Sequence, residues 1–156
     1  MRLVLALLAT ACARPTVREI RNLNEYDRLI QHHKTETGLP VVVDFYSDSC
    51  GPCRMIAPAF KKLAKEMKDR AVFAKVNVAM ARDVASRMRV SSMPTFHFYA
   101  KDGEKIEEEV QGLDVGKLRR ILTKDLGCEA RAEEEEEIVA TPGPGTVKDL
   151  QEKKRE

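Results

Sequence analysis

Aromatic side chains are scarce in this sequence: its 156 residues include no Trp, three Tyr and five Phe. Proteins that stack nucleic-acid bases place aromatic residues among Lys and Arg, and no segment here shows that pattern. The formal net charge is only +2, so the chain also lacks the strong positive charge that a polyanion attracts. We therefore expect no nucleic-acid partner.

The sequence has no apolar segment long enough to cross a membrane. Its longest apolar segment, Leu3–Ala13, is shorter than the roughly 20 residues that a membrane-spanning helix needs, so no membrane span is expected. It ends in Ala11-Cys12-Ala13, which has the small-x-small form of a signal-peptidase site. Residues 1–13 are therefore either a signal peptide cleaved after Ala13, which places the protein in a secretory, extracytoplasmic or organellar compartment, or an uncleaved leader or misplaced start, which leaves it cytoplasmic.

Cysteine is sparse too, with four residues. Cys50 and Cys53 form a close pair, whereas Cys12 and Cys128 stand alone. A disulfide framework needs denser and more regular cysteines, and a zinc site needs four ligands, which no other Cys or His supplies at finger-like spacing. We expect no metal and no cofactor, and the pair is either a redox-active dithiol or a purely structural disulfide.

The period of the apolar residues changes repeatedly between two and about 3.6, which indicates strands alternating with helices. Strands are expected over 17–21, 41–46, 72–78, 95–99 and 104–111, and helices from an Asn24 cap to Gly38, from the cysteine pair to Met67, over 81–88 and over 115–126. The order is βαβαβα followed by ββα. It predicts an α/β fold with a mixed five-stranded sheet and helices on both faces.

The composition changes at Cys128. Beyond it lie the like-charge run Glu133–Glu137 and the breaker cluster Thr141–Gly145, neither of which supports a packed core. We expect one domain over residues 16–127 and an acidic, flexible tail over residues 128–156.

The Cys50-Gly51-Pro52-Cys53 motif lies between an expected strand and an expected helix. Disulfide exchange needs an attacking thiolate and a second thiol to release the mixed disulfide. Cys50 would lie where free N–H groups and the helix dipole stabilise negative charge, and Arg54 adds a cation beside it. Gly51 permits the turn, and Pro52 suits a first helical turn. These features predict Cys50 as the attacking residue and Cys53 as the resolving one.

The chain resembles the thioredoxin family over about Val17–Gly127. The strand Val41–Tyr46 precedes Cys50-Gly51-Pro52-Cys53-Arg54 as the family's core strand precedes its active site. Ser92-Met93-Pro94-Thr95 resembles the family's cis-proline loop. The resemblance implies a thioredoxin fold. It also implies a substrate-binding loop in which Pro94 is cis and faces the cysteines, and Met93 and Thr95 flank it, with the Met93 backbone binding the substrate chain.

Asp44 and Lys75 are unusual residues for buried strands, and the resemblance makes them neighbours. A buried carboxylate is costly unless it is partnered or protonated, so Asp44 is expected to have a raised pKa and to exchange a proton with Cys53. Lys75 is the second catalytic residue that the resemblance implies. The alternatives are an Asp44 that faces solvent at the strand end and a Lys75 whose long stem carries its charge outward.

Ser49 departs from the family pattern. Thioredoxins usually carry Trp immediately before the first active-site cysteine, so the flat aromatic platform is missing from the active-site loop that Ser49 shares with Gly51 and Pro52. We expect weaker docking of the usual partners or a different set of clients.

The resemblance implies a monomeric protein-disulfide reductase that acts on disulfide-containing proteins and is recharged by thioredoxin reductase. The Gly-Pro pair between the cysteines is typical of reducing family members. Two alternatives remain at this point. A secretory-pathway thiol oxidase or isomerase is motivated by residues 1–13, and a redox-gated binding module is motivated by Ser49 and the acidic tail.

Overall fold

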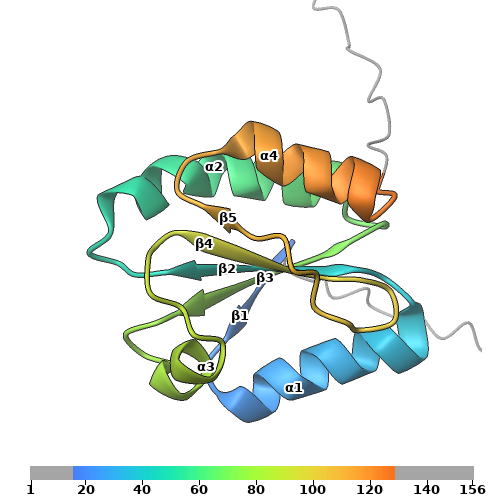
Figure 1. Ribbon diagram of the computed structural model, residues 1–156, viewed down its shortest axis with the longest axis horizontal. Coiled ribbons are helices and arrows are strands. Elements are labelled where there is room, and N and C mark those ends of the chain that lie inside the picture. The colour runs from blue at the N-terminus through green and yellow to red at the C-terminus, as the bar shows by residue number, and fades with distance from the viewer. Residues whose placement is uncertain (1–15, 129–156) are drawn as a thin grey trace, which may run out of the picture.

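The computed structural model describes residues 16–128, and Figure 1 gives their arrangement. The elements are β1 (Val17–Ile20), α1 (Leu23–His32), the π-helical turn η1 (His33–Thr37), β2 (Val41–Tyr46), α2 (Gly51–Glu66), β3 (Val72–Asn77), α3 (Arg82–Arg87), β4 (Thr95–Tyr99), β5 (Val110–Gln111), α4 (Val115–Arg120) and the π-helical turn η2 (Ile121–Asp125). This is the predicted βαβαβα and ββα order.

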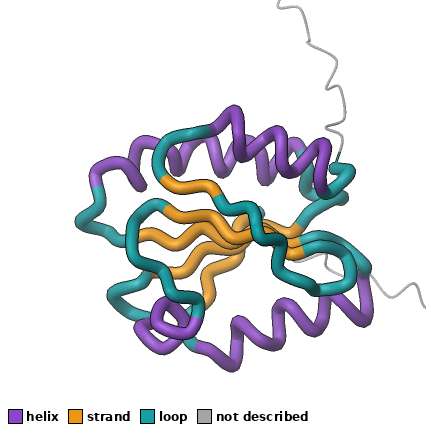
Figure 2. The backbone as a smooth tube through the Cα atoms, viewed as in Figure 1, coloured by secondary structure: helices purple, strands orange, loops and turns teal. Residues whose placement is uncertain are grey.

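The five strands form one mixed sheet in the order β1-β3-β2-β4-β5. β1, β3 and β2 run parallel, while β4 is antiparallel to both β2 and β5. The sheet is a single layer between helices, with α2 and α4 on one face and α1 and α3 on the other (Figures 1 and 2). The predicted α/β class and mixed five-stranded sheet are confirmed.

β2 lies at the centre of the sheet and is buried on both faces, as its continuous apolar run predicts. Val42 packs in the core beneath α2 and α4, whereas Val43 and Phe45 pack in the core beneath α1. Because side chains alternate along a strand, Asp44 lies on the same face as Val42. The strand therefore places its one carboxylate under α2.

The last strand is much shorter than the predicted 104–111. Only Val110–Gln111 pairs with β4, and one isolated bridge joins Tyr99 to Lys105. The residues between Lys105 and Val110 include glutamates whose carboxylates pair with basic side chains. Glu108, for example, lies 2.7 Å from Arg120 of α4. This stretch is a loop in place of the expected ladder.

The first helix is capped by Asn22 and not by the predicted Asn24. The side chain of Asn22 accepts a hydrogen bond from the backbone N–H of Glu25, and the carboxylate of Glu25 accepts one from the N–H of Arg21. This exchange resembles a capping box, in which residues three apart satisfy each other's free donors. The cap therefore lies two residues before the predicted one, and the helix begins at Leu23.

The described residues extend one position past the predicted domain boundary at residue 127. Cys128, predicted to be the first residue of the tail, is buried in the core, and its sulfur lies 3.4 Å from the carbonyl oxygen of Arg70. The remainder of the predicted tail and the predicted leader over 1–13 lie outside the described residues. Among the helices of residues 16–128, none combines the length and apolar character that crossing a membrane requires.

Candidate active site

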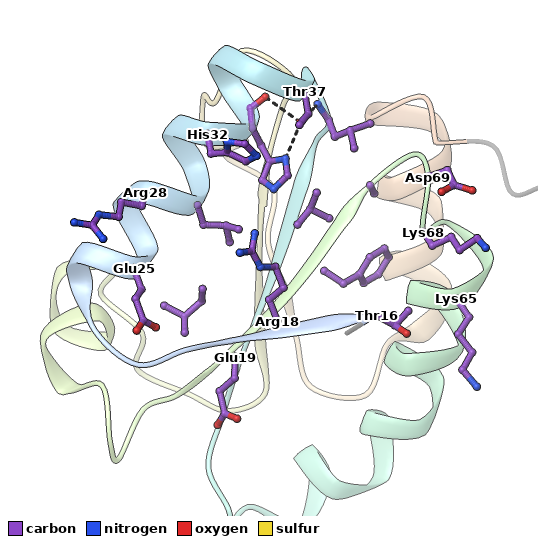
Figure 3. Close-up of a pocket in the computed structure, with 17 residues that line it drawn as sticks. Thr16, Arg18, Glu19, Glu25, Arg28, His32, Thr37, Lys65, Lys68 and Asp69 are labelled. Carbon is purple, nitrogen blue, oxygen red and sulfur yellow. Dashed lines mark hydrogen bonds between the residues drawn. The ribbon is translucent and has the colours of Figure 1, made fainter. Parts of the chain in front are cut away.

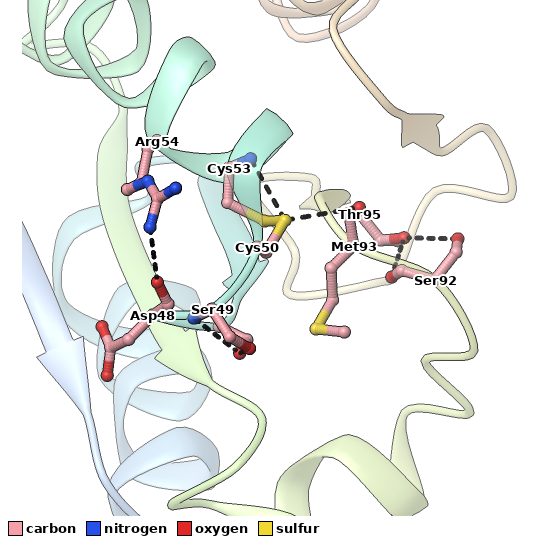
Figure 4. The surroundings of a disulfide bond; sticks show 9 residues. Asp48, Ser49, Cys50, Cys53, Arg54, Ser92, Met93 and Thr95 are labelled. Carbon is pink, nitrogen blue, oxygen red and sulfur yellow. Dashed lines mark hydrogen bonds between the residues drawn. A yellow bond between two sulfur atoms is a disulfide. The ribbon is translucent and has the colours of Figure 1, made fainter.

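Cys50 and Cys53 form a disulfide at the start of α2 (Figure 4). Cys50 is the N-cap residue, and its sulfur accepts a hydrogen bond from the backbone N–H of Cys53 at 3.1 Å. Pro52 lies in the first helical turn, where no intrahelical donor is needed. Since the free N–H groups and the dipole of a helix start favour negative charge, this position stabilises a thiolate on Cys50 when the disulfide is reduced.

The two sulfurs differ in their access to solvent. Cys53 is only 4% exposed and belongs to the buried stripe of α2 that also contains Ile56 and Phe60. Cys50 is partly exposed, and Gly51 beside it has no neighbouring atom where a side chain would begin. A second protein can therefore reach the sulfur of Cys50 but not that of Cys53.

The loop before β4 lies against the disulfide, as Figure 4 shows. The Met93–Pro94 peptide bond is cis, as expected, and the carbonyl oxygen of Met93 lies 3.6 Å from the sulfur of Cys50. The hydroxyl of Thr95 donates to the carbonyl of Ser92 at 2.8 Å, which closes the loop. The side chain of Met93 remains exposed, so the loop presents a carbonyl group and an apolar side chain next to the accessible sulfur.

Asp44 is buried, with 5% of its surface exposed, and its Oδ1 atom has no hydrogen-bond partner. Burial raises the pKa of this carboxyl to about 7, and the positive charge of Lys75 offsets part of that effect. The alternative of a solvent-facing Asp44 is therefore wrong. Near neutral pH the carboxyl is present in both protonation states, which is the property a proton donor and acceptor requires.

Lys75 is the register partner of Asp44 in the sheet, but its amine does not form an ion pair with that carboxylate. The Nζ atom lies 3.4 Å from the hydroxyl of Tyr46 and 3.7 Å from the carboxylate of Glu19, and 5.0 Å from the centre of the Tyr46 ring. The long stem thus carries the charge toward the sheet edge. Lys75 acts on Asp44 through its charge alone.

Ser49 and Arg54 flank the disulfide, and each has a partner that sequence reasoning did not anticipate. The hydroxyl of Ser49 lies 2.9 Å from that of Ser47. The guanidinium of Arg54 donates to the backbone carbonyl of Asp48 at 3.3 Å, and Figure 4 shows it directed to that residue. Asp48 and its partner Asn77 were missed, since they meet only through the fold; an acidic residue just after the central strand was the one available signal.

The remaining candidate ligands and cavities are separate from this site. Cys128 lies beyond the far end of α2, a helix of 16 residues and so about 24 Å long. Within residues 16–128, no three His, Cys, Asp or Glu side chains are grouped as a metal site would need. A groove of about 1,210 Å³ lies beside β1 between α1 and the end of α2 (Figure 3). None of the expected site residues lines it.

The geometry is that of a dithiol–disulfide exchange centre. An accessible sulfur lies at a helix N-terminus, a second sulfur is buried one turn further along, and a buried carboxyl that titrates near pH 7 lies under the same helix. The adjoining loop offers a peptide carbonyl to an incoming chain.

Comparison with known proteins agrees with this geometry. The family model described as Thioredoxin matches residues 17–124. A thioredoxin of Coprinus comatus is 39% identical over 111 residues, which cover 70% of this chain and 98% of that protein.

Two solved structures extend the comparison to the fold. The thioredoxin of Fasciola hepatica superposes with a TM-score of 0.62 at 38% identity, covering 68% of this chain and 96% of that one. A second chain has a TM-score of 0.58 at 33% identity and covers 67% and 91%. It comes from a study of thiol resolution in a yeast mitochondrial 1-Cys peroxiredoxin by the glutathione and thioredoxin systems.

Proposed function

Because this chain belongs to the thioredoxin family, we propose that its activity, the reduction of protein disulfides, begins with attack by Cys50 and ends with resolution by Cys53. The observation that carries this assignment is the contrast between the two sulfurs, since Cys50 is partly exposed at the helix start and Cys53 is 4% exposed. The oxidase, isomerase and binding-module alternatives are not favoured by the similarity to the thioredoxins of Coprinus comatus and Fasciola hepatica.

The reaction proceeds in two exchanges. The Cys50 thiolate attacks one sulfur of the client disulfide, which forms a mixed disulfide and releases the other client sulfur as a thiolate. The Cys53 thiolate then attacks the Cys50 sulfur, which closes the Cys50–Cys53 bond and releases the second client thiolate. Two electrons pass from the dithiol to the client, and the protons of the dithiol balance the client thiolates.

Asp44 serves the second exchange in this proposal. Cys53 must lose its proton before it attacks, and the buried site excludes most of the water that would accept it. Asp44 lies on the sheet face that α2 covers, and its pKa of about 7 lets the carboxylate take up a proton near neutral pH. We assign Asp44 as the proton acceptor for Cys53, with Lys75 tuning its charge.

The partner proteins follow from the same chemistry. The client would lie along the loop of Met93, Pro94 and Thr95 in an extended form, where peptide groups meet the exposed Met93 carbonyl. We propose that a thioredoxin reductase returns the disulfide to the dithiol, and that the protein acts as a monomer. An oxidised peroxiredoxin is a suitable physiological client to test beside insulin, given the peroxiredoxin system of one structural relative.

Replacing Cys53 with Ser should trap the client on Cys50. The first exchange proceeds in Cys53→Ser, but the serine hydroxyl cannot attack the mixed disulfide, so that intermediate accumulates. Mass spectrometry after incubation of the reduced variant with oxidised client would detect the adduct. The double variant Cys50→Ser/Cys53→Ser is the control and should trap nothing. If Cys53→Ser forms no adduct while Cys50→Ser does, the two roles are reversed.

A further inference from the structure

The segment Ser47–Ser49, which joins β2 to Cys50, contains no aromatic residue and is held by polar contacts (Figure 4). The hydroxyls of Ser47 and Ser49 lie 2.9 Å apart, and the N–H of Cys50 donates to the carbonyl of Ser47 at 3.1 Å. These contacts form the turn itself. They do not attach it to the rest of the domain.

Asp48 makes that attachment on one side, through Asn77 at the end of β3. The amide of Asn77 donates from Nδ2 to Oδ2 of Asp48 at 2.8 Å, and its Oδ1 accepts from the N–H of Ala79 at 3.0 Å. Asn77 is only 7% exposed, so its amide needs partners within the protein. The side-chain amide of Asn77 is thereby fixed through both its nitrogen and its oxygen, and it holds the exposed side chain of Asp48 in place.

Arg54 makes the attachment on the other side, from α2. Its guanidinium donates to the backbone carbonyl of Asp48 at 3.3 Å, while its own backbone N–H donates to the carbonyl of Cys50 at 3.3 Å. Asp48 is thus tied by its carboxylate to the sheet and by its backbone to the helix that begins at Cys50. Every one of these contacts lies within four residues of Cys50 or at the strand end beside it.

We propose that Asp48, held by Asn77 and Arg54, is the positioning residue that fixes Cys50 at the start of α2 for attack on client disulfides. The proposal rests on the role assigned to Cys50 above. A misplacement of about 1 Å at a reacting atom can lower a rate by about 100-fold. The polar clamp of Asp48, Asn77 and Arg54 orients Cys50 in a loop that has no Trp.

The competing explanation is electrostatic, and it predicts the opposite sign. A carboxylate near Cys50 disfavours a thiolate, so removing the Asp48 charge would by itself make Cys50 ionise at lower pH. The positioning role predicts that losing the hydrogen bond loosens the turn and with it the Cys53 N–H contact to the Cys50 sulfur. Cys50 would then ionise at higher pH and react more slowly.

The experiment compares Asp48→Ala with Asp48→Asn in the full chain. Two quantities are measured: kcat/KM for insulin reduction, and the pH midpoint of Cys50 alkylation by iodoacetamide, followed by mass spectrometry. Asp48→Ala should lower kcat/KM about tenfold and move the midpoint upward. Asp48→Asn keeps an oxygen that accepts from Asn77 and should stay within about twofold of the wild type.

Exchanging the amide and the carboxylate between positions 48 and 77 tests whether the lost rate can be recovered. Asn77→Asp places two carboxylates against each other and should resemble Asp48→Ala. Asp48→Asn combined with Asn77→Asp restores an amide–carboxylate bond with donor and acceptor exchanged, and should recover most of the lost rate. The proposal is overturned if Asp48→Ala behaves as the wild type, if the midpoint falls equally in both Asp48 variants, or if the double variant stays as slow as Asn77→Asp.

Asn22→Ala is the matched control, because it also removes a side-chain hydrogen bond next to the start of a helix, but does so at α1, away from the disulfide. It should lower stability without moving the alkylation midpoint. Insulin reduction by the wild type tests the proposed function separately. The alkylation midpoints test the positioning role whether or not insulin is a substrate.

Discussion

Replacing Cys50 with Ser should lower the rate of insulin reduction by more than about 1,000-fold, to the rate of the added reductant alone. A serine hydroxyl is not ionised at neutral pH and is a poor nucleophile toward sulfur. Cys53 cannot take over the attack, since it is 4% exposed beneath the first turn of α2. The measurement is the turbidity of reduced insulin, with dithiothreitol as the electron source.

Cys128→Ser is the matched control for this result. It makes the same atomic change at a buried cysteine beyond the far end of α2, where the hydroxyl can still donate to the carbonyl of Arg70. Its activity should equal that of the wild type. Retained turnover in Cys50→Ser would falsify the assigned nucleophile, whereas loss in both variants would show that the assay reports folding and not exchange.

Replacing Asp44 with Asn should stabilise the protein by about 2–4 kcal/mol at about pH 8. Burial raises the pKa of Asp44 to about 7 in the folded protein, whereas an unfolded Asp titrates near about 4. Between these values the unfolded chain has released a proton that the folded chain still holds. The contribution of Asp44 to the stability of the wild type is therefore most favourable below about pH 4, falls as the pH rises to about 7, and changes no further above that.

The test is the free energy of unfolding by urea, measured for both proteins between about pH 4 and pH 9. The difference between Asp44→Asn and wild type should be small at the acidic end and grow until about pH 7. Asp69→Asn supplies the control, because it makes the same change at an exposed position and should leave the pH dependence unaltered. A difference that does not vary with pH would mean that Asp44 titrates normally.

Local patterns in the sequence were sufficient for the elements that carry the chemistry. The run Val41–Tyr46 is apolar except for Asp44 and begins with three β-branched valines, which is typical of a strand buried on both faces, and it has the predicted bounds. The carboxylate within it was expected to be buried because its burial has a large cost, and the raised pKa of Asp44 follows. The cysteine motif and the cis bond at Pro94 also lie where expected.

Contacts between distant residues could not be predicted in this way. Asp48 and Asn77 are 29 positions apart and meet only because β2 and β3 pair in parallel register. β5 is shorter than predicted, and the loop before it pairs Glu108 with Arg120 of the following helix; such a pairing gives no periodic signal in the sequence. Lys75 was expected to neighbour Asp44 and is its register partner, but the carboxylate of Glu19 on β1 lies 3.7 Å from its amine.

The burial of Cys128 has a practical consequence for following this protein in cells. It is the free cysteine of residues 16–128 in the oxidised state, and burial raises the pKa of its thiol, so it reacts slowly with alkylating reagents. A mass-tagged maleimide added to the native protein should therefore distinguish the two redox states at Cys50, the partly exposed sulfur of the pair, because Cys53 and Cys128 are both buried. The reduced form would carry a tag at Cys50 that the oxidised form lacks, and the fraction in each gel band would report the protein's redox state directly.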